Sequence, residues 1–361
     1  MSHSDKEMIS FFITTRCNLN CIYCYTNKDS VVHQDQSLDF EFAKAGIDDY
    51  YSTNYAKHIR FFGAGEPTME LALIKKILEY AKSKDPKTTS EIQTNGCFSE
   101  TTGKWLADNI DIIWVSSDGI PEIQNHYRPF VDGSPSSPVL ERNLQYLASK
   151  CKGVTGIRMT ITNENVSNQI QNIDYFRSLG IKNFWVDPMF PSVGEKEAYE
   201  KIDMNKFTEE FLKAVKYAYS NGMTYGSILT CNFDKPGVYA CRALLPVPHL
   251  TTDGFVSACD MALFGRDMDH MDIFIYGKWN PNTNTIEYDW KKLTFLRSRE
   301  LKNLKKCSKC EVGKYCRGYC PGEVTNETGN LFGCKSNICS STIRLFHELS
   351  EAEKQYCYLH P

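Results

Sequence analysis

Three cysteines near the start of the chain, Cys17, Cys21 and Cys24, have the spacing Cys-x3-Cys-x2-Cys, which predicts a metal cluster site. A [4Fe–4S] cube normally takes four protein thiolates, one for each iron, so a triplet leaves one iron able to bind another molecule. The apolar residues 9–13 precede the triplet and predict a strand, which puts the cysteines in a loop at a strand end. The alternatives are a zinc site, for which the nearest histidine is His33, and buried free thiols.

Three polar motifs follow predicted strands further along the chain. Gly63-Ala64-Gly65-Glu66-Pro67 follows the second strand, Gln93-Thr94-Asn95-Gly96 ends the third, and Ser116-Ser117-Asp118-Gly119 ends the fourth. Glycines let a backbone approach a ligand closely, and a carboxylate such as that of Glu66 can bind an ammonium group. A tight structural turn is the alternative for the glycine-rich motif.

Most of the remaining cysteines lie in the C-terminal part of the chain. Cys241 and Cys259 flank a predicted hairpin at Asp253-Gly254, and a dense group begins at Cys307 and ends at Cys339. Thiolate-only ligand sets favour iron–sulfur clusters, and structural zinc is the alternative.

The elements that must position these residues alternate between strands and helices from residue 8 to about 220. Strands are predicted at 8–14, 58–62, 89–94, 110–116, 155–161 and 181–186, and helices near 39–53, 69–82, 99–108, 138–149, 166–178 and 203–220. Six such units with nearly continuous apolar strands predict a parallel sheet covered by helices, with too few strands for the usual eight-stranded barrel. After residue 225 prolines and cysteines dominate, and a last helix is predicted over 341–355.

The composition narrows the class of protein. The chain has 361 residues, a net charge of −3 and no basic tract, which disfavours binding of nucleic acid through its phosphates. It shows no signal peptide and no apolar stretch long enough to span a membrane, so a cytoplasmic protein is predicted. Fifteen cysteines in such a chain indicate metal binding rather than disulfides.

Together the cysteine triplet and the three polar motifs resemble the radical S-adenosylmethionine (AdoMet) superfamily. The resemblance implies an α/β fold with an open, partial (β/α)6 barrel over residues 8–225, after a tail at 1–7. It also implies that the free iron of a [4Fe–4S] cluster chelates AdoMet, whose cleavage gives a 5′-deoxyadenosyl radical.

The same resemblance assigns roles to residues of the motifs. It implies that Cys17, Cys21 and Cys24 hold the cluster and that Gly63, Gly65 and Glu66 contact the AdoMet amino group. Ser116 and Arg142 would hold the AdoMet carboxylate, and Tyr23, Thr94 and Asn95 would complete the cofactor site. A solvated helix residue is the alternative for Arg142.

The C-terminal cysteines resemble the SPASM extension of radical AdoMet enzymes, which implies two auxiliary [4Fe–4S] clusters within residues 226–361. The outer cluster would use Cys307, Cys310, Cys316 and Cys339, with Cys334 as the fallback for Cys339, which is expected to open the last helix. The inner cluster would use Cys241, Cys259 and Cys320. Its fourth ligand is missing because position 247 is Val, so it has an open iron or is completed by Cys231 or Cys334.

Asp260 follows Cys259 directly and matches an aspartate proposed as the proton acceptor in anaerobic sulfatase-maturing enzymes. Burial beside a cluster would raise its pKa towards that of a useful base. An exposed hairpin residue is the alternative.

The resemblance implies an oxidoreductase that abstracts a hydrogen atom from a peptide or protein and gives an oxidised residue or a thioether, ether or carbon–carbon crosslink. A flavodoxin- or ferredoxin-like electron donor is expected. Because the core begins near residue 8, no N-terminal peptide-recognition domain is expected. The alternatives are peptide epimerisation with Cys97 or Cys231 as hydrogen donor, dehydrogenation of a small molecule such as an aminosugar, and a non-enzymatic metal scaffold.

Overall fold

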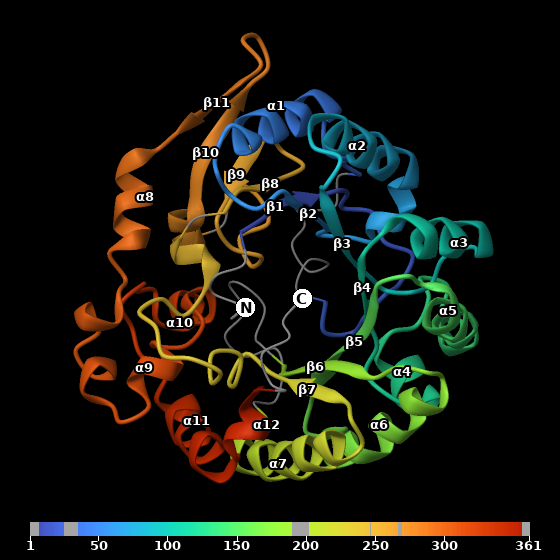
Figure 1. The fold of residues 1–361 in the computed structure, drawn as a ribbon, viewed down its shortest axis with the longest axis vertical. Helices are drawn as coiled ribbons and strands as arrows, with labels where there is room; N and C mark the ends of the chain where they lie inside the picture. The colour runs from blue at the N-terminus through green and yellow to red at the C-terminus, as the bar shows by residue number, and fades with distance from the viewer. Residues whose placement is uncertain (1–6, 25–34, 190–201, 246, 266–268, 356–361) are drawn as a thin grey trace.

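The computed structural model describes residues 7–24, 35–189, 202–245, 247–265 and 269–355, and these residues form one sheet surrounded by helices (Figure 1). The order of strands across the sheet is β11-β10-β9-β8-β1-β2-β3-β4-β5-β6-β7. The strands are β1 (Ile9–Phe12), β2 (His58–Phe62), β3 (Thr89–Thr94), β4 (Ile112–Ser116), β5 (Val154–Ile161), β6 (Asn183–Pro188), β7 (Thr224–Gly226), β8 (His249–Leu250), β9 (Phe255–Ser257), β10 (Ile275–Asn280) and β11 (Thr285–Tyr288).

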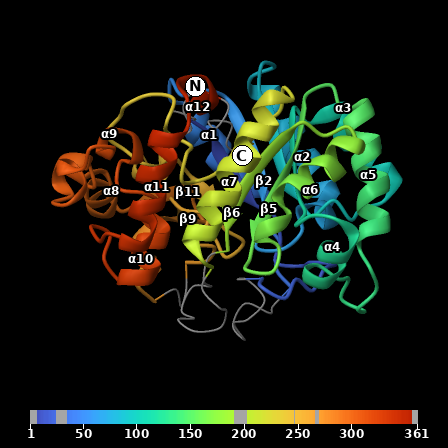
Figure 2. The ribbon, with the colours of Figure 1, turned by 90° about the horizontal axis from the view of Figure 1, so that it is seen from below.

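The helices cover the outside of this sheet, and the C-terminal helices complete the ring that the first seven begin (Figures 1 and 2). They are α1 (Phe40–Tyr51), α2 (Leu71–Lys84), α3 (Glu100–Asn109), α4 (Pro121–Tyr127), α5 (Ser137–Lys150), α6 (Gln169–Ser178), α7 (Met204–Ser220), α8 (Trp290–Arg297), α9 (Gly313–Cys316), α10 (Pro321–Thr328), α11 (Ser336–Glu348) and α12 (Glu351–Gln355). None of the helices in the described part of the chain is long and apolar enough to cross a membrane.

Strands β1 to β7 pair in parallel, which confirms the predicted strand–helix units. Strands β1 and β2 are buried along their whole length because both faces of the sheet are covered. Phe11 and Phe61 are register partners that join the large core under the helices. Phe12 and Phe62, one residue further along, join a separate cluster with Leu263 inside the ring, as the alternation of side chains along a strand requires.

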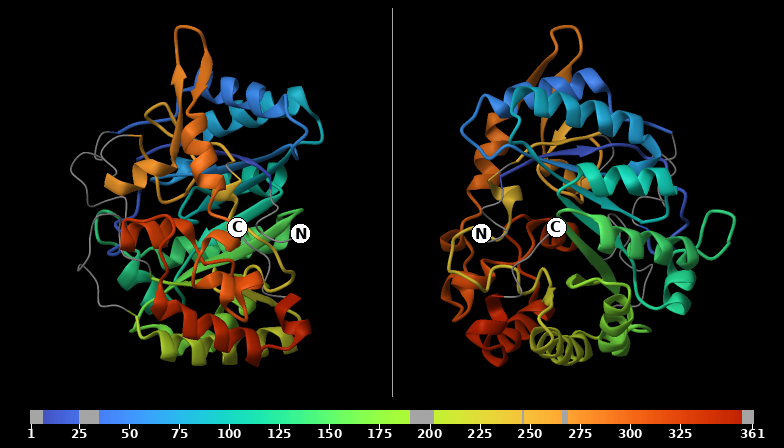
Figure 3. Two further views of the ribbon diagram at one scale, coloured as in Figure 1. Left: turned by 90° about the vertical axis from the view of Figure 1, so that its left-hand side faces the viewer. Right: turned by 45° about the vertical axis from the view of Figure 1, so that its right-hand side comes forward.

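The C-terminal region adds its own strands to the same sheet. Strand β8 pairs in parallel with β1, and β9, β10 and β11 follow as an antiparallel meander. The hairpin predicted at Asp253-Gly254 joins β8 to β9, with Gly254 at φ +85°, a conformation that glycine adopts readily. The β10–β11 hairpin projects from the body of the molecule (Figure 3). The division of the chain at residue 225 stays a prediction.

The prediction of one last helix over 341–355 was wrong. Helix α11 begins at Ser336 and ends at Glu348, and the short α12 follows after Leu349 and Ser350. Cys339 therefore lies within the first turn of α11 rather than at the start of the last helix. Sequence analysis also missed α4 and α8 to α10, which are short segments without a long apolar period.

Candidate active site

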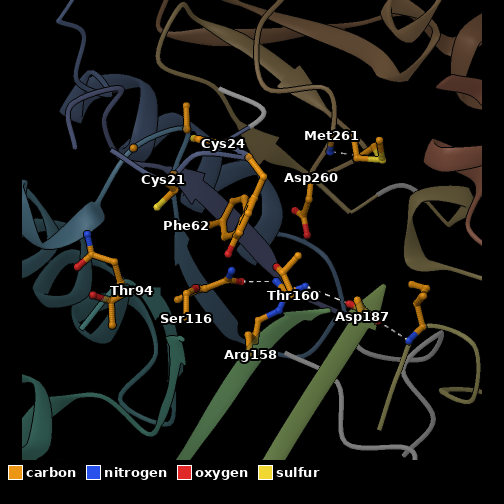
Figure 4. Close-up of a pocket in the computed structure, with 18 of the residues that line it drawn as sticks. Cys21, Cys24, Phe62, Thr94, Ser116, Arg158, Thr160, Asp187, Asp260 and Met261 are labelled. Carbon is orange, nitrogen blue, oxygen red and sulfur yellow. Dashed lines mark hydrogen bonds and ion pairs between the residues drawn. The ribbon is translucent and has the colours of Figure 1, made fainter. Parts of the chain in front are cut away.

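A cavity of about 340 Å³ lies at the carboxyl ends of the parallel strands, where loops from the barrel meet the C-terminal region (Figure 4). Fourteen of the predicted site residues line it: Cys17, Cys21, Tyr23, Cys24, Gly63, Gly65, Glu66, Thr94, Asn95, Ser116, Cys241, Cys259, Asp260 and Cys320. Six do not: Arg142, Cys307, Cys310, Cys316, Cys334 and Cys339. The cavity thus brings together residues from both ends of the chain.

The cysteine triplet follows β1 and faces side chains from two neighbouring loops. The Asn95 amide nitrogen lies 3.9 Å from the Cys17 sulfur, and Nη1 of Arg128 lies 4.0 Å from the Cys21 sulfur. Burial raises the pKa of Cys17 to about 12 and that of Cys21 to about 11, so these thiols need nearby positive charge to ionise. Iron would supply that charge, so the thiol set fits a cluster.

The glycine-rich loop after β2 packs against the backbone of the cysteine loop. The amide of Gly65 donates to Thr14 O and that of Glu66 donates to Arg16 O, both at 2.8 Å. A Cβ atom at Gly65 would lie 2.1 Å from Arg16 O, so only glycine fits at this position. The structure therefore gives Gly65 a role in holding the cysteine loop, in addition to the predicted contact with AdoMet.

The Glu66 carboxylate lines the cavity but is already bound by several donors. It accepts hydrogen bonds from Thr68 N at 3.0 Å, Thr68 Oγ1 at 2.6 Å, Thr94 Oγ1 at 2.6 Å and Asn95 N at 2.6 Å. These bonds tie the loop after β2 to the end of β3. Burial raises the pKa of Glu66 above its usual value, and the four hydrogen bonds offset this effect only in part.

The structure does not place Arg142 at the cavity, in contrast to the sequence assignment. Its side chain is 47% exposed on α5, where Nη2 donates to Phe98 O at 3.2 Å and Nη1 lies 3.9 Å from Glu100. Arginine does reach the cavity at Arg128, whose Nε donates to Asp118 at 2.9 Å. Sequence analysis assigned Arg128 no role.

Cys241, Cys259 and Cys320 line the cavity on the side of the C-terminal region. Burial raises the pKa of all three thiols, and each pair of these sulfurs interacts electrostatically. The residues that flank the β8–β9 hairpin and the residue before α10 thus supply one group of thiols. This inner group adjoins the cavity that the N-terminal triplet also lines.

A second, outer group contains five cysteines: Cys307, Cys310, Cys316, Cys334 and Cys339. The sulfurs of Cys334 and Cys339 lie 3.9 Å apart, and Cys334 also interacts with Cys307. The structure therefore places Cys334 in the outer group, against its use as fourth ligand of the inner one. In the described residues no three His, Cys, Asp or Glu side chains converge on a point that could hold one metal ion.

Arg299 lies between the two groups of cysteines. Its side chain is fully buried, and it donates to the carbonyl oxygens of Leu331 and Gly318 at 2.5 and 2.8 Å. Among the described residues its Nη1 atom has no hydrogen-bond partner, while thiols of both groups act on its charge. A buried cation with neutral partners favours anions nearby, and thiolate-bound clusters would be such anions.

Asp260 is held by positive charge from several directions. Arg60, fully buried on β2, donates from Nη1 to both carboxylate oxygens at 2.8 and 2.9 Å. Nδ1 of His249 lies 3.0 Å away and Nη2 of Arg242 lies 3.5 Å away. Burial would raise the pKa of Asp260, but these groups, Arg60 above all, lower it well below its usual range. The expectation of a raised pKa was wrong.

Arg158 and Asp187 also line the cavity, from the neighbouring strands β5 and β6 (Figure 4). Arg158 donates from Nη1 to the Gln93 side chain at 2.6 Å, and its Nη2 lies 3.6 Å from Asp187. With Arg60 and Asp260 these residues make up what we call the charged group. Sequence analysis missed Arg158 and Asp187, although charged residues inside apolar strands were an available signal.

The two thiols considered as hydrogen donors lie outside the cavity lining. Cys97 is buried in the main core, and its thiol is 3.8 Å from Ser136 O. Cys231 is buried in a separate apolar cluster with Trp114 and Trp185. Neither position supports donation of a hydrogen atom to a substrate in this cavity.

The first half of the chain, which contains the triplet and the barrel loops, matches a known protein family. Residues 11–190 match the radical SAM superfamily. The chain belongs to this superfamily, which implies a [4Fe–4S] cluster and AdoMet as cofactors.

Relatives of known sequence extend the likeness beyond this segment. An uncharacterised protein of Methanocaldococcus jannaschii is 31% identical over 187 residues, or 51% of this chain. The match spans 63% of that protein, which is less than two thirds of its length. A radical SAM cyclopropyl synthase of Paramaledivibacter caminithermalis is 22% identical over 96% of this chain and 75% of its own. A cysteine-type anaerobic sulfatase-maturating enzyme of Clostridium perfringens is 24% identical over 84% of this chain and 85% of its own.

Solved structures share the whole fold. The enzyme anSMEcpe with bound AdoMet and the peptide Kp18Cys has a TM-score of 0.72 at 19% identity, covering 94% of this chain and 96% of its own. Streptococcus suis SuiB bound to its precursor peptide SuiA has a TM-score of 0.66 at 17% identity, covering 93% and 76%. These matches confirm the predicted fold class, a partial barrel with a C-terminal SPASM region.

Proposed function

We propose that this chain abstracts a hydrogen atom from a residue of a peptide or protein and converts that residue to an oxidised or crosslinked product. The observation that carries the proposal is the shared cavity, which the N-terminal triplet and the inner cysteine group both line. An oxidation removes two electrons from the substrate, so a second electron acceptor beside the cavity suits this reaction.

Each of the three groups of cysteines would hold one [4Fe–4S] cluster. The triplet Cys17, Cys21 and Cys24 would hold the AdoMet cluster, which when bound passes an electron to AdoMet and yields a radical that abstracts hydrogen. The inner group would hold one auxiliary cluster with three thiolates, and the outer group would hold the other. A flavodoxin- or ferredoxin-like protein would supply the electron.

The barrel residues around the triplet would bind AdoMet. Ser116, Tyr23, Thr94 and Asn95 line the cavity beside the triplet, and Glu66 ties the loop after β2 to the end of β3. Arg128 would neutralise the AdoMet carboxylate in place of Arg142, because its guanidinium is at the cavity and within reach of the triplet.

A peptide substrate is supported by the structural neighbours, since anSMEcpe and SuiB are both known with peptides bound. Epimerisation of a peptide is disfavoured because Cys97 and Cys231 do not line the cavity. Dehydrogenation of a small molecule is the remaining rival.

The test incubates the reconstituted enzyme with AdoMet, dithionite and 18-residue peptides that each contain a single Cys or Ser. Glucosamine and heavy water are included in parallel reactions. We expect peptide-dependent 5′-deoxyadenosine and a peptide that has lost two hydrogen atoms. A thioaldehyde formed from Cys would be hydrolysed further to the aldehyde, with release of hydrogen sulfide. Formation of 5′-deoxyadenosine that depends on the aminosugar and not on a peptide would contradict the proposal. Deuterium at the Cα of an unoxidised peptide would also contradict it.

A further inference from the structure

The outer group of cysteines lies near the surface of the molecule. None of its five members lines the substrate cavity, and all five residues are partly exposed. Helix α9, which ends at Cys316, stands at the outer edge of the ring in two perpendicular views (Figures 1 and 2). The outer group is therefore placed to meet another protein rather than the substrate.

Lysines surround the outer group without a matching number of acidic residues. Residues 301–310 include four lysines and no Asp or Glu, although the chain as a whole has a net charge of −3. Cys307 and Cys310 each follow a lysine directly. The exposed lysines closest in sequence to the cysteines of this segment and of α9 are Lys305, Lys306, Lys309 and Lys314.

The charge of these four lysines is not neutralised by neighbours. Within the described parts of the chain, none of the four forms an ion pair. The nearby acidic residues have other partners, since Glu300 lies 2.5 Å from Lys302 and Glu311 lies 3.1 Å from His347. Ammonium groups gathered on one face attract a partner of opposite charge and orient it during the encounter.

An exposed apolar residue, Val238, lies between the basic segments. Its side chain belongs to a residue that is 52% exposed. The Val238 carbonyl oxygen accepts from Leu301 N at 3.1 Å, and the amide of Gly237 donates to Lys314 O at 2.8 Å. Protein interfaces combine an apolar centre with a polar rim. We call Val238 and the four exposed lysines the lysine surface.

We propose that the lysine surface binds an acidic one-electron carrier protein of the flavodoxin or ferredoxin kind, which takes up the second electron of the substrate oxidation. The inference deepens the proposed function and rests on it. A small charged surface beside a redox group suits such a carrier, because electron-transfer complexes are weak and bury little area.

The electrons and protons of this step balance for a cysteine residue of the substrate. Abstraction of a hydrogen atom breaks a C–H bond and leaves a carbon radical. The S–H proton then passes to water, a C=S bond forms, and one electron is left over. That electron passes by way of the inner and outer groups to the oxidised carrier, which is reduced by one electron.

The first experiment measures binding and needs no substrate. The reconstituted enzyme is titrated with an oxidised flavodoxin and, separately, with an oxidised ferredoxin, both of net negative charge, at low and high salt. The test variant combines Lys305→Glu, Lys306→Glu and Lys309→Glu, and a second variant has Gln at the same positions. The control combines Lys76→Glu, Lys87→Glu and Lys104→Glu, which are exposed lysines of the barrel.

We expect the Glu variant to weaken carrier binding by about tenfold or more at low salt and the control by about twofold or less. The Gln variant should lie between them, and high salt should reduce the difference. Iron content is measured for each variant, and the Gln variant decides if the Glu variant has lost iron. Equal affinity of the test and control variants, or no binding of either carrier by the wild type, would overturn the inference.

The second experiment measures electron transfer in a background that lacks Cys17, Cys21 and Cys24, each replaced by Ala. This protein is reduced with dithionite, desalted, and mixed with oxidised flavodoxin in a stopped-flow instrument. We expect flavodoxin semiquinone to form, and to form about tenfold more slowly when the three lysines are replaced by Glu. A rate that the lysine substitutions leave unchanged would overturn the inference.

A last comparison separates the carrier from the substrate as occupant of the surface. If the lysine variants lose affinity for an acidic peptide substrate and keep affinity for both carriers, the inference is wrong. Absence of peptide-dependent 5′-deoxyadenosine from the wild type would instead refute the proposed function. The binding and stopped-flow measurements would still decide whether the lysine surface binds a carrier, since neither uses a peptide or AdoMet.

Discussion

The two sides of the cavity are built in different ways. Around the N-terminal triplet, the loops after β1, β2 and β3 are joined by short hydrogen bonds between neighbouring segments, such as Gly65 N to Thr14 O. In the charged group, Arg60 and Asp260 are separated by 200 residues and joined by one buried ion pair. The first side is built within the barrel, from loops tied by several hydrogen bonds, whereas the second depends on the C-terminal region docking against the barrel.

The two sides of the cavity suit two different tasks, binding of the cofactor and oxidation of the substrate. The triplet side has the residue types needed to hold a cofactor, and its acceptors are largely used, as for Glu66. On the side of the charged group, Arg158 and Asp187 line the cavity as an ion pair, 3.6 Å apart. We therefore expect changes on the triplet side to abolish radical formation and changes in the charged group to alter the later oxidation of the substrate.

The largest effect is expected from Cys24→Ala. Loss of one ligand from a three-thiolate site should abolish 5′-deoxyadenosine formation, measured by chromatography of the quenched reaction. Cys97→Ala is the matched control, because that thiol is buried beside the same loops but does not line the cavity. Equal loss of 5′-deoxyadenosine formation in Cys24→Ala and Cys97→Ala would contradict the special role of the triplet.

Removal of the buried cation by Arg60→Met should reduce the free energy of unfolding strongly. Asp260 and Glu91 would then lose the Arg60 guanidinium, although Asp260 keeps His249 and Arg242 and Glu91 keeps His58. Breaking a buried pair costs about 3–5 kcal/mol, and the remaining partners put the expected loss at the lower end of that range. Arg344→Met is the control, since its exposed pair with Glu348 contributes about 0.5 kcal/mol or less. Urea unfolding measures both, and similar midpoints for the two variants would show that the Arg60 pair is not important.

Gly65→Ala should displace the cysteine loop, since the new Cβ would overlap Arg16 O. Overpacking of this kind costs about 1–3 kcal/mol, and we expect it to lower the iron bound by the triplet. Gly103→Ala on α3 is the control, because its Cβ would meet only the Phe98 ring at 3.1 Å. Full iron content in Gly65→Ala would mean that the loop adapts without loss of the cluster.

The smallest effect is expected for the late cysteines of the outer group. Five thiols share a site that needs four, and Cys334 and Cys339 are adjacent. Cys334→Ala and Cys339→Ala should therefore each retain the wild-type iron content, whereas the double variant should lose one cluster. Loss of iron in only one single variant would identify the sole ligand and reject exchange between the two thiols.

The contrast between the two sides also explains which residues could be predicted from the sequence. The triplet, Glu66 and Ser116 fall within short motifs at strand ends, so their spacing alone indicated a common site. Asp187 and Arg158 carry no motif, and their meeting depends on the register of β5 and β6. The lowered pKa of Asp260 was not predictable because Arg60 lies on a strand that is distant in the sequence. Family spacing does not fix which face of α5 carries Arg142, and its role at the AdoMet carboxylate stays a prediction.

The central claim is that one cavity adjoins both the AdoMet cluster and an auxiliary cluster of a three-cluster enzyme. Iron and acid-labile sulfide per chain, measured on anaerobically reconstituted protein, test it most directly. The account predicts about twelve of each in the wild type and about eight in the triple variant Cys241→Ala, Cys259→Ala, Cys320→Ala. About four irons with one or two zinc ions in the wild type would contradict it, and would reduce the C-terminal cysteines to structural ligands.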